Sequence, residues 1–327
     1  MRTLRAGIVG LGVMGRHHLR ILKELEGVEL VGVFDPAISM SNSSLGTTIY
    51  PSLEALLSCG LDYCVLSAPT AYHLELGLKI AGAGVHALIE KPVATTAAEA
   101  KQLVQHFDSH NLIGGVGHVE RFNPAIQAMR QKIAEGLLGE IYQVATRRQG
   151  PFPARISDVG VVKDLATHDI DLTMWVMNRD YISVSAHTAF QSGRQFEDMV
   201  VAIGKLEGDV ITNHVVNWLS PFKERQTTVI GQRGALVADT LTADLTFYEN
   251  GRQGESWDGV SSFRGVSEGS ILRFALSKTE PLLLEHLVFR DAVKTENSSQ
   301  IVSLSQGAAA VQIADSILMS ARTILST

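Results

Sequence analysis

The sequence predicts an α/β protein that begins with a doubly wound parallel sheet and continues with a domain built on a mostly antiparallel sheet. Up to about residue 120, short apolar runs alternate with helical patterns, which is the element order of a parallel, doubly wound sheet. After residue 120, extended runs follow one another with turn residues between them, as in antiparallel sheets. We therefore expect two domains, at residues 1–121 and 122–327.

The expected elements of the first domain follow from apolar runs and helical periodicity. Its strands are expected at Ala6–Gly10, Val28–Phe34, Tyr63–Ser67, Val85–Ile89 and Leu112–Val116. Its helices are expected between them, at Gly15–Leu25, Ser52–Leu57, Ala71–Ala81 and Thr96–Phe107.

In the second domain, helices are expected at Pro124–Glu135, from about Asp164 to Met177, at Pro281–Thr295 and at Ser305–Ile324. Strands are expected at Tyr142–Arg148, Tyr181–Thr188, Met199–Leu206, Asp209–Asn217, Arg225–Ile230 and Ala235–Asp239. Residues 250–270 are rich in Gly and Ser and are expected to form a long loop.

Composition and charge narrow the classes of function. Apolar residues make up 45% of the chain and charged residues 19%, as in globular proteins. The net charge of −6 disfavours attraction to nucleic acid or to an anionic membrane, and no apolar run has the length of a membrane span. Cys59 and Cys64 lack the spacing of a metal site, and Cys64 lies in an apolar run that suits a buried, reduced thiol. We expect a cytoplasmic protein that binds neither nucleic acid nor a membrane.

The first strand leads into a glycine-rich turn. Gly10, Gly12 and Gly15 have the G-x-G-x-x-G spacing of a dinucleotide-binding turn in a Rossmann fold. The first glycine permits a tight turn, the second lets a pyrophosphate approach the main chain, and the third lets helix and strand pack closely. Val13 and Met14 then begin a helix whose free N–H groups and positive dipole end suit phosphates. The alternative is a glycine-rich turn that binds no ligand.

Asp35 indicates which dinucleotide the turn binds. It ends the second expected strand, about 20 residues beyond the glycines, where an acidic side chain can accept from the ribose 2′-OH of NAD. A carboxylate there disfavours the 2′-phosphate of NADP, so we expect NAD, with NADP as the alternative.

Two further segments follow expected parallel strands, at the edge where ligands bind on such sheets. They are Pro69–His73 and Glu90–Pro92. We expect the cofactor-facing residues of these segments to be Pro69, Thr70, His73, Glu90 and Lys91.

Lys91 is the first candidate for proton transfer. A dehydrogenase must remove the hydroxyl proton of its substrate as well as a hydride, so it needs a base. A cationic nicotinamide ring nearby would disfavour the ammonium form of Lys91. The adjacent Pro92 stiffens the turn. The alternative is a solvated surface lysine.

The second candidate is the helical stretch that contains Asp164, His168 and Asp171. Their spacing of four and then three residues places all three on one helix face. A histidine flanked by carboxylates can be held in an orientation useful for proton transfer. The alternatives are an ordinary buried histidine after an Asp at the helix start, or a metal site. The metal-site interpretation lacks a convincing third ligand position, and we expect no metal.

These motifs, in their order and spacing, resemble the glucose–fructose oxidoreductase/inositol dehydrogenase (Gfo/Idh/MocA) family. They are Gly10-x-Gly12-x-x-Gly15, Ala68-Pro69-Thr70 with His73, Glu90-Lys91-Pro92, and Asp164-x-x-x-His168-x-x-Asp171. The resemblance covers essentially the whole chain. It implies an N-terminal Rossmann domain and a C-terminal α/β domain with an open, mostly antiparallel sheet. It also implies homodimers or homotetramers that pair through that sheet. It implies catalytic roles for Lys91 and His168 and a substrate-binding role for Asp164.

Two segments, Gly117–Pro124 and Arg147–Val162, resemble the branch of UDP-N-acetylglucosamine 3-dehydrogenases within this family. The region from Arg147 to Lys163 is rich in cations, and arginine can bind a diphosphate in a bidentate manner. We therefore expect an NAD-dependent dehydrogenase of a nucleotide-linked amino sugar. Its substrate-binding residues would be Asp164, His168, Arg121, Arg147, Arg148 and Arg155, with a structural or cofactor role as the alternative for Arg121 and a solvated basic loop as the alternative for the region.

Two other functions remain open. One is oxidation of a free sugar or polyol such as an inositol, which would not depend on Arg147, Arg148 and Arg155. The other is a sensor that binds NAD without turnover, although a sensor has no need of a proton acceptor such as Lys91 or His168. The sequence contains no Tyr-x-x-x-Lys pair, no Gly-x-Ser-x-Gly elbow and no Gly-x-x-x-x-Gly-Lys-Ser/Thr phosphate loop.

Overall fold

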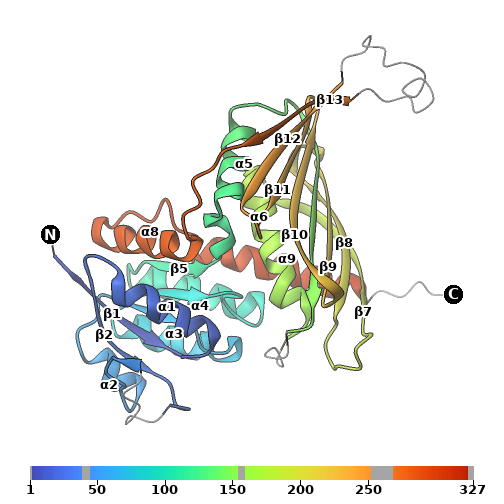
Figure 1. Ribbon diagram of the computed structural model, residues 1–327. Coiled ribbons are helices and arrows are strands. Elements are labelled where there is room, and N and C mark those ends of the chain that lie inside the picture. Colours follow the sequence, from blue (N-terminus) through green and yellow to red (C-terminus); the bar gives the residue numbers. More distant parts are fainter. Residues whose placement is uncertain (1, 39–44, 154–158, 252–267, 323–327) are drawn as a thin grey trace, which may run out of the picture. The chain divides into compact units, whose positions relative to one another are not determined.

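The computed structural model describes residues 2–38, 45–153, 159–251 and 268–322 (Figure 1). The chain forms two compact units. The first contains residues 1–119 and 280–315, and the second contains residues 120–279 and 316–327. The sequence placed residues 280–315 in the second domain, whereas in the structure they pack in the first unit.

The first unit contains a parallel five-stranded sheet in the order β2-β1-β3-β4-β5, which confirms the predicted doubly wound architecture. The strands are β1 (Leu4–Val9), β2 (Val28–Phe34), β3 (Tyr63–Leu66), β4 (His86–Glu90) and β5 (Gly114–Gly117). The helices between them are α1 (Val13–Glu24), α2 (Leu53–Leu57), α3 (His73–Gly82) and α4 (Ala97–Ser109).

Helix α8 (Pro281–Thr295) returns to the first unit because its apolar side completes that unit's core. Phe289 of α8 packs edge-on against Tyr63 of β3, with ring centroids 5.5 Å apart. Ala292 and Val293 join the same buried cluster as Leu22 of α1. The last helix, α9 (Leu304–Ala321), contributes residues 304–315 to the first unit and 316–321 to the second.

The second unit contains an eight-stranded sheet in the order β13-β12-β11-β10-β6-β9-β8-β7. Strands β6 and β9 pair in parallel, and the other strand pairs of this sheet are antiparallel, as predicted for most of it. The strands are β6 (Ile141–Pro151), β7 (Tyr181–Ala189), β8 (Met199–Leu206), β9 (Ile211–Asn217), β10 (Leu219–Gly231), β11 (Gly234–Asp239), β12 (Asp244–Asn250) and β13 (Glu268–Phe274).

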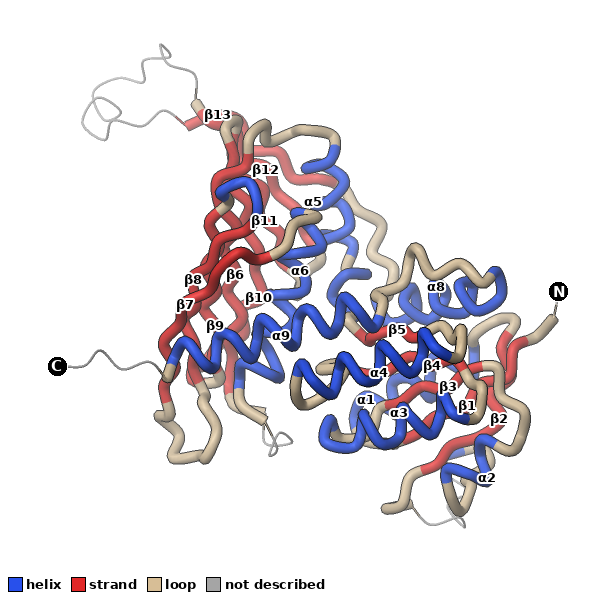
Figure 2. The backbone as a smooth tube through the Cα atoms, turned by 180° about the vertical axis from the view of Figure 1, so that it is seen from behind, coloured by secondary structure: helices blue, strands red, loops and turns tan. Residues whose placement is uncertain are grey.

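Strands β12 and β13 were not among the predicted strands. The loop expected at residues 250–270 falls largely on residues 252–267, which lie outside the described residues. Helices α5 (Pro124–Ala134) and α6 (Thr167–Met177) lie against one face of the sheet, as Figures 1 and 2 show. Leu172 of α6 and Val144 of β6 belong to one buried cluster, so this covered face carries the unit's core.

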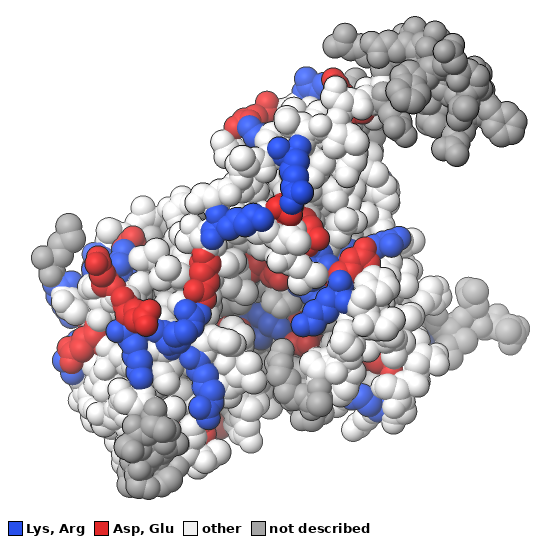
Figure 3. Space-filling view, viewed as in Figure 1, with Lys and Arg blue, Asp and Glu red and all other residues white. Residues whose placement is uncertain are grey.

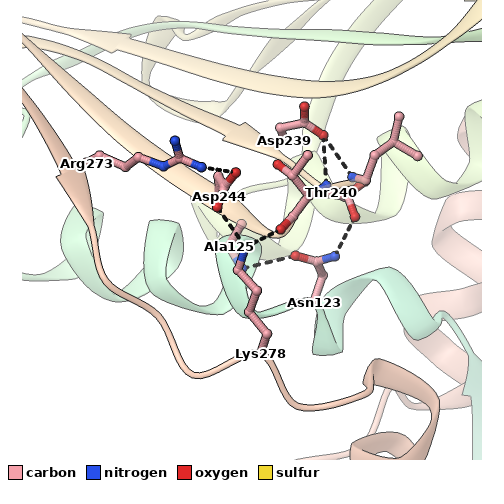
Figure 4. A network of polar contacts seen from close by, with 9 residues as sticks. Asn123, Ala125, Asp239, Thr240, Asp244, Arg273 and Lys278 are labelled. Carbon is pink, nitrogen blue, oxygen red and sulfur yellow. Dashed lines mark hydrogen bonds and ion pairs between the residues drawn. The ribbon is translucent and has the colours of Figure 1, made fainter.

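The start of α5 is attached to the turn between β11 and β12 (Figure 4). Asn123 caps the helix by accepting from the Ala125 N–H at 3.0 Å, and its amide donates to the Thr240 carbonyl at 3.0 Å. Asp244 of β12 accepts from Lys278 at 2.9 Å and also pairs with Arg273 of β13. These contacts hold the helix, the turn and the edge strands together.

The opposite face of this sheet is open and carries exposed apolar side chains. The strand register places on it a row of side chains that are more than one-third exposed: Val201, Ile203, Ile211, Ile230, Tyr248 and Ile271.

On the molecular face in Figure 3, basic and acidic side chains are interleaved. Within the described ranges, no helix has the length and apolarity needed to cross a bilayer.

Candidate active site

The glycine turn between β1 and α1 has the geometry of a phosphate cradle. Gly10 has φ of 89°, which favours glycine, and a Cβ there would lie 2.6 Å from the Ala68 nitrogen. A Cβ on Gly15 would lie 2.1 Å from the Gly10 carbonyl oxygen. A Cβ on Gly12, in contrast, would meet no described atom within 4 Å, so space lies in front of the turn at this residue alone of the three.

The N-terminus of α1 faces that space with its N–H groups uncapped. Gly12 is the N-cap, and among the described residues no side chain caps the helix start. Gly12 and Val13 are exposed and Met14 is half-buried. Free N–H groups at an exposed helix start bind anions, so the residues present fit the pyrophosphate of a dinucleotide.

Asp35 lies beside the glycine turn, as the sequence predicted from its position after β2. One carboxylate oxygen accepts from the Leu11 N–H at 2.7 Å, and the other accepts from the Ala37 N–H at 2.8 Å. These two bonds fix the carboxylate next to the main chain that forms the cradle. The arrangement fits a ribose-binding acid.

The segment after β3 is held by His73. Its ring nitrogens lie 2.8 Å from the Ala68 carbonyl oxygen and 3.0 Å from the Pro92 carbonyl oxygen. Burial lowers the pKa of His73, against the opposing effect of these carbonyls. His73 therefore braces the main chain after β3 against the turn after β4. Pro69 is exposed and Thr70 is half-buried at the start of a short 3-10 helix, Thr70–Tyr72.

Lys91 directly follows β4, and its peptide bond to Pro92 is cis. Its side chain is half-buried. The Lys91 N–H donates to the Glu90 carboxylate at 3.1 Å. Glu90 is buried, so the carboxylate of this motif points into the unit while the lysine remains accessible.

In the second unit, Asp164 lies on a π-helical turn, Val162–Ala166, directly before α6. The Thr167 N–H donates to the Val162 carbonyl, five residues back, where the sequence led us to expect an ordinary α-helical start. Such π turns are frequent at functional sites. Asp164 and His168 are both buried, with 5% and 9% of their surfaces exposed.

Glu197 braces this turn from the segment before β8. Its carboxylate accepts from the Val162 N–H at 3.1 Å, and its carbonyl accepts from the Val161 N–H at 2.9 Å. Gly160 provides the room, because a Cβ there would lie 2.1 Å from the Glu197 carboxylate. Burial raises the pKa of Glu197, against the effect of these bonds and of the Lys163 and Arg194 charges.

Asp171 accepts two hydrogen bonds from Arg121, at 2.7 and 2.5 Å, and both side chains are buried. The bidentate pair links the start of the second unit to α6. This geometry supports the structural alternative for Arg121, because its guanidinium is occupied by a carboxylate below the surface.

Arg148 is likewise buried in ion pairs. Its guanidinium lies 2.9 Å from Asp169 of α6 and 2.9 Å from Glu120. Burial raises the pKa of Asp169, since desolvation outweighs the charge of Arg148. A diphosphate would have to displace both carboxylates, so this geometry disfavours the expected substrate contact of Arg148.

Arg147 and Arg148 are neighbours in β6, so their side chains point to opposite faces of the sheet. Arg148 lies on the face covered by α6. The side chain of Arg147 is 62% exposed on the open face, 4.0 Å from Glu224. The expected diphosphate contact of Arg147 is therefore on the wrong face for a substrate held by Asp164. Arg155 lies outside the described residues.

Two half-buried arginines that the sequence did not single out are better placed within the second unit. Arg225 of β10 pairs in register with Arg148, so it shares the face of α6. Its pKa is lowered by burial and by Arg148, and the charges of Asp169, Glu120 and Asp164 oppose that shift. Arg194 lies three residues before Glu197, which braces the Asp164 turn. The guanidinium of Arg194 lies 4.1 Å from the centroid of the Phe152 ring. No local sequence motif identifies either arginine, because the position of Arg225 depends on strand register and that of Arg194 on stacking against an aromatic ring.

Among the described residues, there is no group of three or more His, Cys, Asp or Glu side chains placed to hold a metal ion.

Comparison with known proteins extends these observations. Residues 4–118 match the model of an oxidoreductase family with an NAD-binding Rossmann fold, and residues 126–237 match the model of the GFO/IDH/MocA C-terminal domain. UDP-N-acetylglucosamine 3-dehydrogenase of Acidithiobacillus ferrooxidans is 29% identical over 254 residues, covering 77% of this chain and 79% of that protein. The scyllo-inositol 2-dehydrogenase (NAD(+)) of Bacillus subtilis is 26% identical over 281 residues, covering 80% and 81%.

Solved structures show the same fold. A structure of the Acidithiobacillus ferrooxidans UDP-N-acetylglucosamine 3-dehydrogenase has a TM-score of 0.84 at 25% identity, covering 98% of this chain and 100% of that one. The WlbA dehydrogenase of Bordetella pertussis, solved with NADH and UDP-GlcNAcA, has a TM-score of 0.80 at 22% identity, covering 98% and 97%.

Proposed function

We propose that this chain, which belongs to the Gfo/Idh/MocA family of NAD-binding oxidoreductases, oxidises a hydroxyl of a nucleotide-linked amino sugar such as UDP-N-acetylglucosamine. The observation that carries the proposal is a pair of buried polar side chains, Asp164 on the π-helical turn and His168 at the start of α6. A buried acid and an imidazole on consecutive helical segments suit a substrate hydroxyl and its proton. The 29% identical UDP-N-acetylglucosamine 3-dehydrogenase supports the substrate class.

In the proposed reaction, a secondary alcohol becomes a ketone as its carbon loses a hydride and its oxygen loses a proton. Bound NAD supplies the hydride acceptor. Lys91 or His168 accepts the hydroxyl proton, and Asp164 holds the sugar by accepting from a hydroxyl. The glycine turn and the N-terminus of α1 hold the pyrophosphate.

The proposed cofactor is NAD rather than NADP. The two bonds from the Leu11 and Ala37 N–H groups hold the Asp35 carboxylate beside the glycine turn. A 2′-phosphate near that carboxylate would suffer like-charge repulsion. We expect NAD to support turnover at a kcat/KM at least about tenfold above that with NADP, a difference of about 1.4 kcal/mol.

For the diphosphate we propose Arg194 and Arg225, together with Arg155. Arg225 lies on the sheet face that α6 covers, and Arg194 lies near the Glu197 brace of the Asp164 turn. Arg225→Ala and Arg194→Ala should each raise KM for the UDP-sugar about tenfold or more, since each removes a charge-assisted contact. The comparison variant is Arg147→Ala, whose side chain is on the open face and which should change KM less than about twofold.

The central test is a panel of UDP-sugars and free sugars, with formation of reduced cofactor followed by absorbance. Lys91→Ala and His168→Ala should each lower kcat by about 100-fold or more while NAD binding stays nearly intact. Lys101→Ala, on the exposed side of α4, serves as the control. Full activity in both active-site variants would refute the assigned roles. Equal rates on the free sugar and its UDP form would refute the nucleotide-linked substrate.

A second candidate function is oxidation of a free polyol, favoured by the 26% identity to scyllo-inositol 2-dehydrogenase. It predicts turnover of an inositol and no effect of Arg194→Ala or Arg225→Ala. The same substrate panel separates the two functions.

We also propose that the protein forms a homodimer or homotetramer through the open face of the eight-stranded sheet, in the cytoplasm. The row of exposed apolar side chains on that face supports the interface, because large exposed apolar patches mark association surfaces. Cys59 and Cys64 are free thiols, which fits a reducing compartment.

A further inference from the structure

A buried cluster of titratable side chains lies directly behind Lys91 in the first unit. It contains Glu90 at the end of β4, His18 of α1, and Glu285 and His286 of α8. Each of the four is at most 6% exposed. None of these side chains takes part in the reaction proposed above, and buried polar groups of this kind call for an explanation.

Short contacts join three of them into a chain. The Nε2 atom of His18 lies 2.8 Å from a carboxylate oxygen of Glu90, and its Nδ1 atom lies 2.8 Å from Nε2 of His286. The second carboxylate oxygen of Glu90 accepts from the Lys91 N–H at 3.1 Å. The chain therefore runs from α8 through α1 to the main chain of Lys91.

The surroundings leave the Glu90 carboxylate little freedom. Gly117 at the end of β5 provides its space, since a Cβ there would lie 3.1 Å from the carboxyl carbon of Glu90. With one oxygen bonded to His18 and the other to the Lys91 N–H, rotation of the carboxylate would break both bonds. The position of Lys91 is thus coupled to two helices.

The pKa values of the two buried glutamates are shifted in opposite directions. Burial alone would raise the pKa of Glu90, but the hydrogen bond and charge of His18 and the charge and N–H of Lys91 outweigh it and hold that pKa below its usual value. Burial and the nearby Glu90 charge raise the pKa of Glu285 well above its usual value. Burial and His18 lower the pKa of His286, which is therefore neutral.

The charged or titratable groups facing Glu90 come from several elements: His18 from α1, His73 from α3, Glu285 from α8 and the adjacent Lys91. Glu285 contributes no hydrogen bond to the chain, because both of its carboxylate oxygens lack a partner among the described residues. Glu90 is then the anion of the cluster, beside Lys91.

We infer that His18 and His286 are positioning residues that hold the Glu90 carboxylate in place, so that Glu90 fixes the main chain of Lys91. This role rests on the proposed function of Lys91 and deepens it. Helix α8 thereby supports Lys91 through His286, although it is distant from Lys91 in sequence and carries no recognisable motif.

The two glutamates provide a matched test. Glu90→Gln keeps the shape but replaces one of the two oxygens that contact His18 and the Lys91 N–H by an NH2 group, so kcat should fall by about tenfold or more while KM for NAD changes less than about threefold. Glu285→Gln keeps the size of a buried side chain whose carboxylate makes no hydrogen bond to the described residues, so kcat and KM should both stay within about twofold. A wild-type kcat in Glu90→Gln would overturn the inference, as would equal losses in the two variants.

His18 is tested by rescue. His18→Leu removes the donor to Glu90 and should lower kcat about as much as Glu90→Gln. His18→Gln retains an amide N–H that can reach Glu90 and should recover most of that loss. Equal kcat values in these two variants would overturn the inference even if Glu90→Gln does not fold. Thermal melting of each variant identifies a general loss of stability.

A third measurement does not need a sugar substrate. Glu90→Gln disturbs the contacts that hold the main chain of Lys91, so the rate at which an amine-acylating reagent labels Lys91 should differ at least about threefold between Glu90→Gln and the wild type. Peptide mass spectrometry gives the rate, with exposed Lys101 as the internal standard. If the wild type oxidises no sugar but labelling changes, the proposed function fails and the positioning role stands. Unchanged labelling with unchanged kcat removes the positioning role alone.

Discussion

Replacing single glycines of the turn after β1 separates two functions of that turn. Gly15→Ala should destabilise the first unit, and Gly12→Ala should leave its stability nearly unchanged while blocking the cofactor. The two residues lie three apart in one motif, so the pair controls for position in the sequence. The difference follows from what a Cβ would meet at each.

The cost of Gly15→Ala follows from its neighbours. A Cβ would lie 2.1 Å from the Gly10 carbonyl oxygen, more than 1 Å inside an ordinary contact of 3.4 Å, and 2.8 Å from the Ser67 hydroxyl. Overpacking of this kind costs about 1–3 kcal/mol, and the better helix propensity of alanine returns up to about 1 kcal/mol. A net loss of about 2 kcal/mol would lower the melting temperature of the first unit by about 4–8 °C.

Gly12→Ala has the opposite profile. Its Cβ would meet no described atom within 4 Å, and the Gly12 φ of −63° suits alanine. Alanine is a weaker N-cap than glycine, but it lowers the conformational entropy of the unfolded chain, which offsets that loss. The melting temperature without ligand should therefore stay within about 3 °C of the wild type. The methyl group would stand where the pyrophosphate approaches, so affinity for NAD should fall by about tenfold or more.

Thermal melting with and without NAD, together with titration calorimetry, measures both effects. At a concentration 100 times its Kd, NAD should stabilise the wild type by about 2.7 kcal/mol, and Gly12→Ala should lose most of the corresponding rise in melting temperature. If Gly12→Ala binds NAD as tightly as the wild type, the predicted role of Gly12 in cofactor binding is wrong. If Gly15→Ala melts at the wild-type temperature without ligand, the predicted packing role of Gly15 is wrong.

Three further predictions concern the second unit. Arg148→Met leaves the buried Asp169 and the half-buried Glu120 without their cation and should cost about 3–5 kcal/mol in urea unfolding, whereas the exposed Arg147→Met should cost less than about 0.5 kcal/mol; similar costs would contradict the buried ion pair. Burial lowers the pKa of His214 from 6.5 to about 4, so between these pH values His214 is protonated in the unfolded chain but not in the folded protein. The free energy of unfolding should therefore fall by about 3 kcal/mol as the pH falls from about 6.5 to 4. If urea unfolding of His214→Gln shows the same dependence of stability on pH as the wild type, this prediction is wrong. Ile203→Lys on the open sheet face should lower the molar mass seen by light scattering, and an unchanged mass would exclude that face as the interface.

The elements with strong local patterns were predictable. The parallel sheet of the first unit, the helix after the glycine turn and the position of Asp35 follow from apolar runs, glycine spacing and strand ends, which depend on near neighbours in the chain. The buried position of Asp164 and His168 also agrees with their helical spacing, although the π-helical form of the turn does not follow from it. The start of this turn is held by Glu197, which accepts from the Val162 N–H and is distant from it in sequence.

The predictions that failed or changed depend on packing between distant segments. Residues 280–315 joined the first unit because Phe289 fills the space beside Tyr63, which no local signal announces. Strands β12 and β13 extend the sheet beyond the runs that the sequence singled out.

Residue type and spacing alone singled out the glycine stretch, Asp35, Lys91 and the Asp164–His168 pair, because each uses the geometry of one turn or one helix, and their roles stay predictions. The tertiary structure decided which charges are available. The packing of α6 decided which face of β6 is covered, so that burial joined Arg148 to carboxylates, while Arg147 is exposed and Arg225 is half-buried on the face of α6. The tertiary structure also brought His286 of α8 to His18. Burial and hydrogen bonding depend on distance in space rather than on distance along the chain.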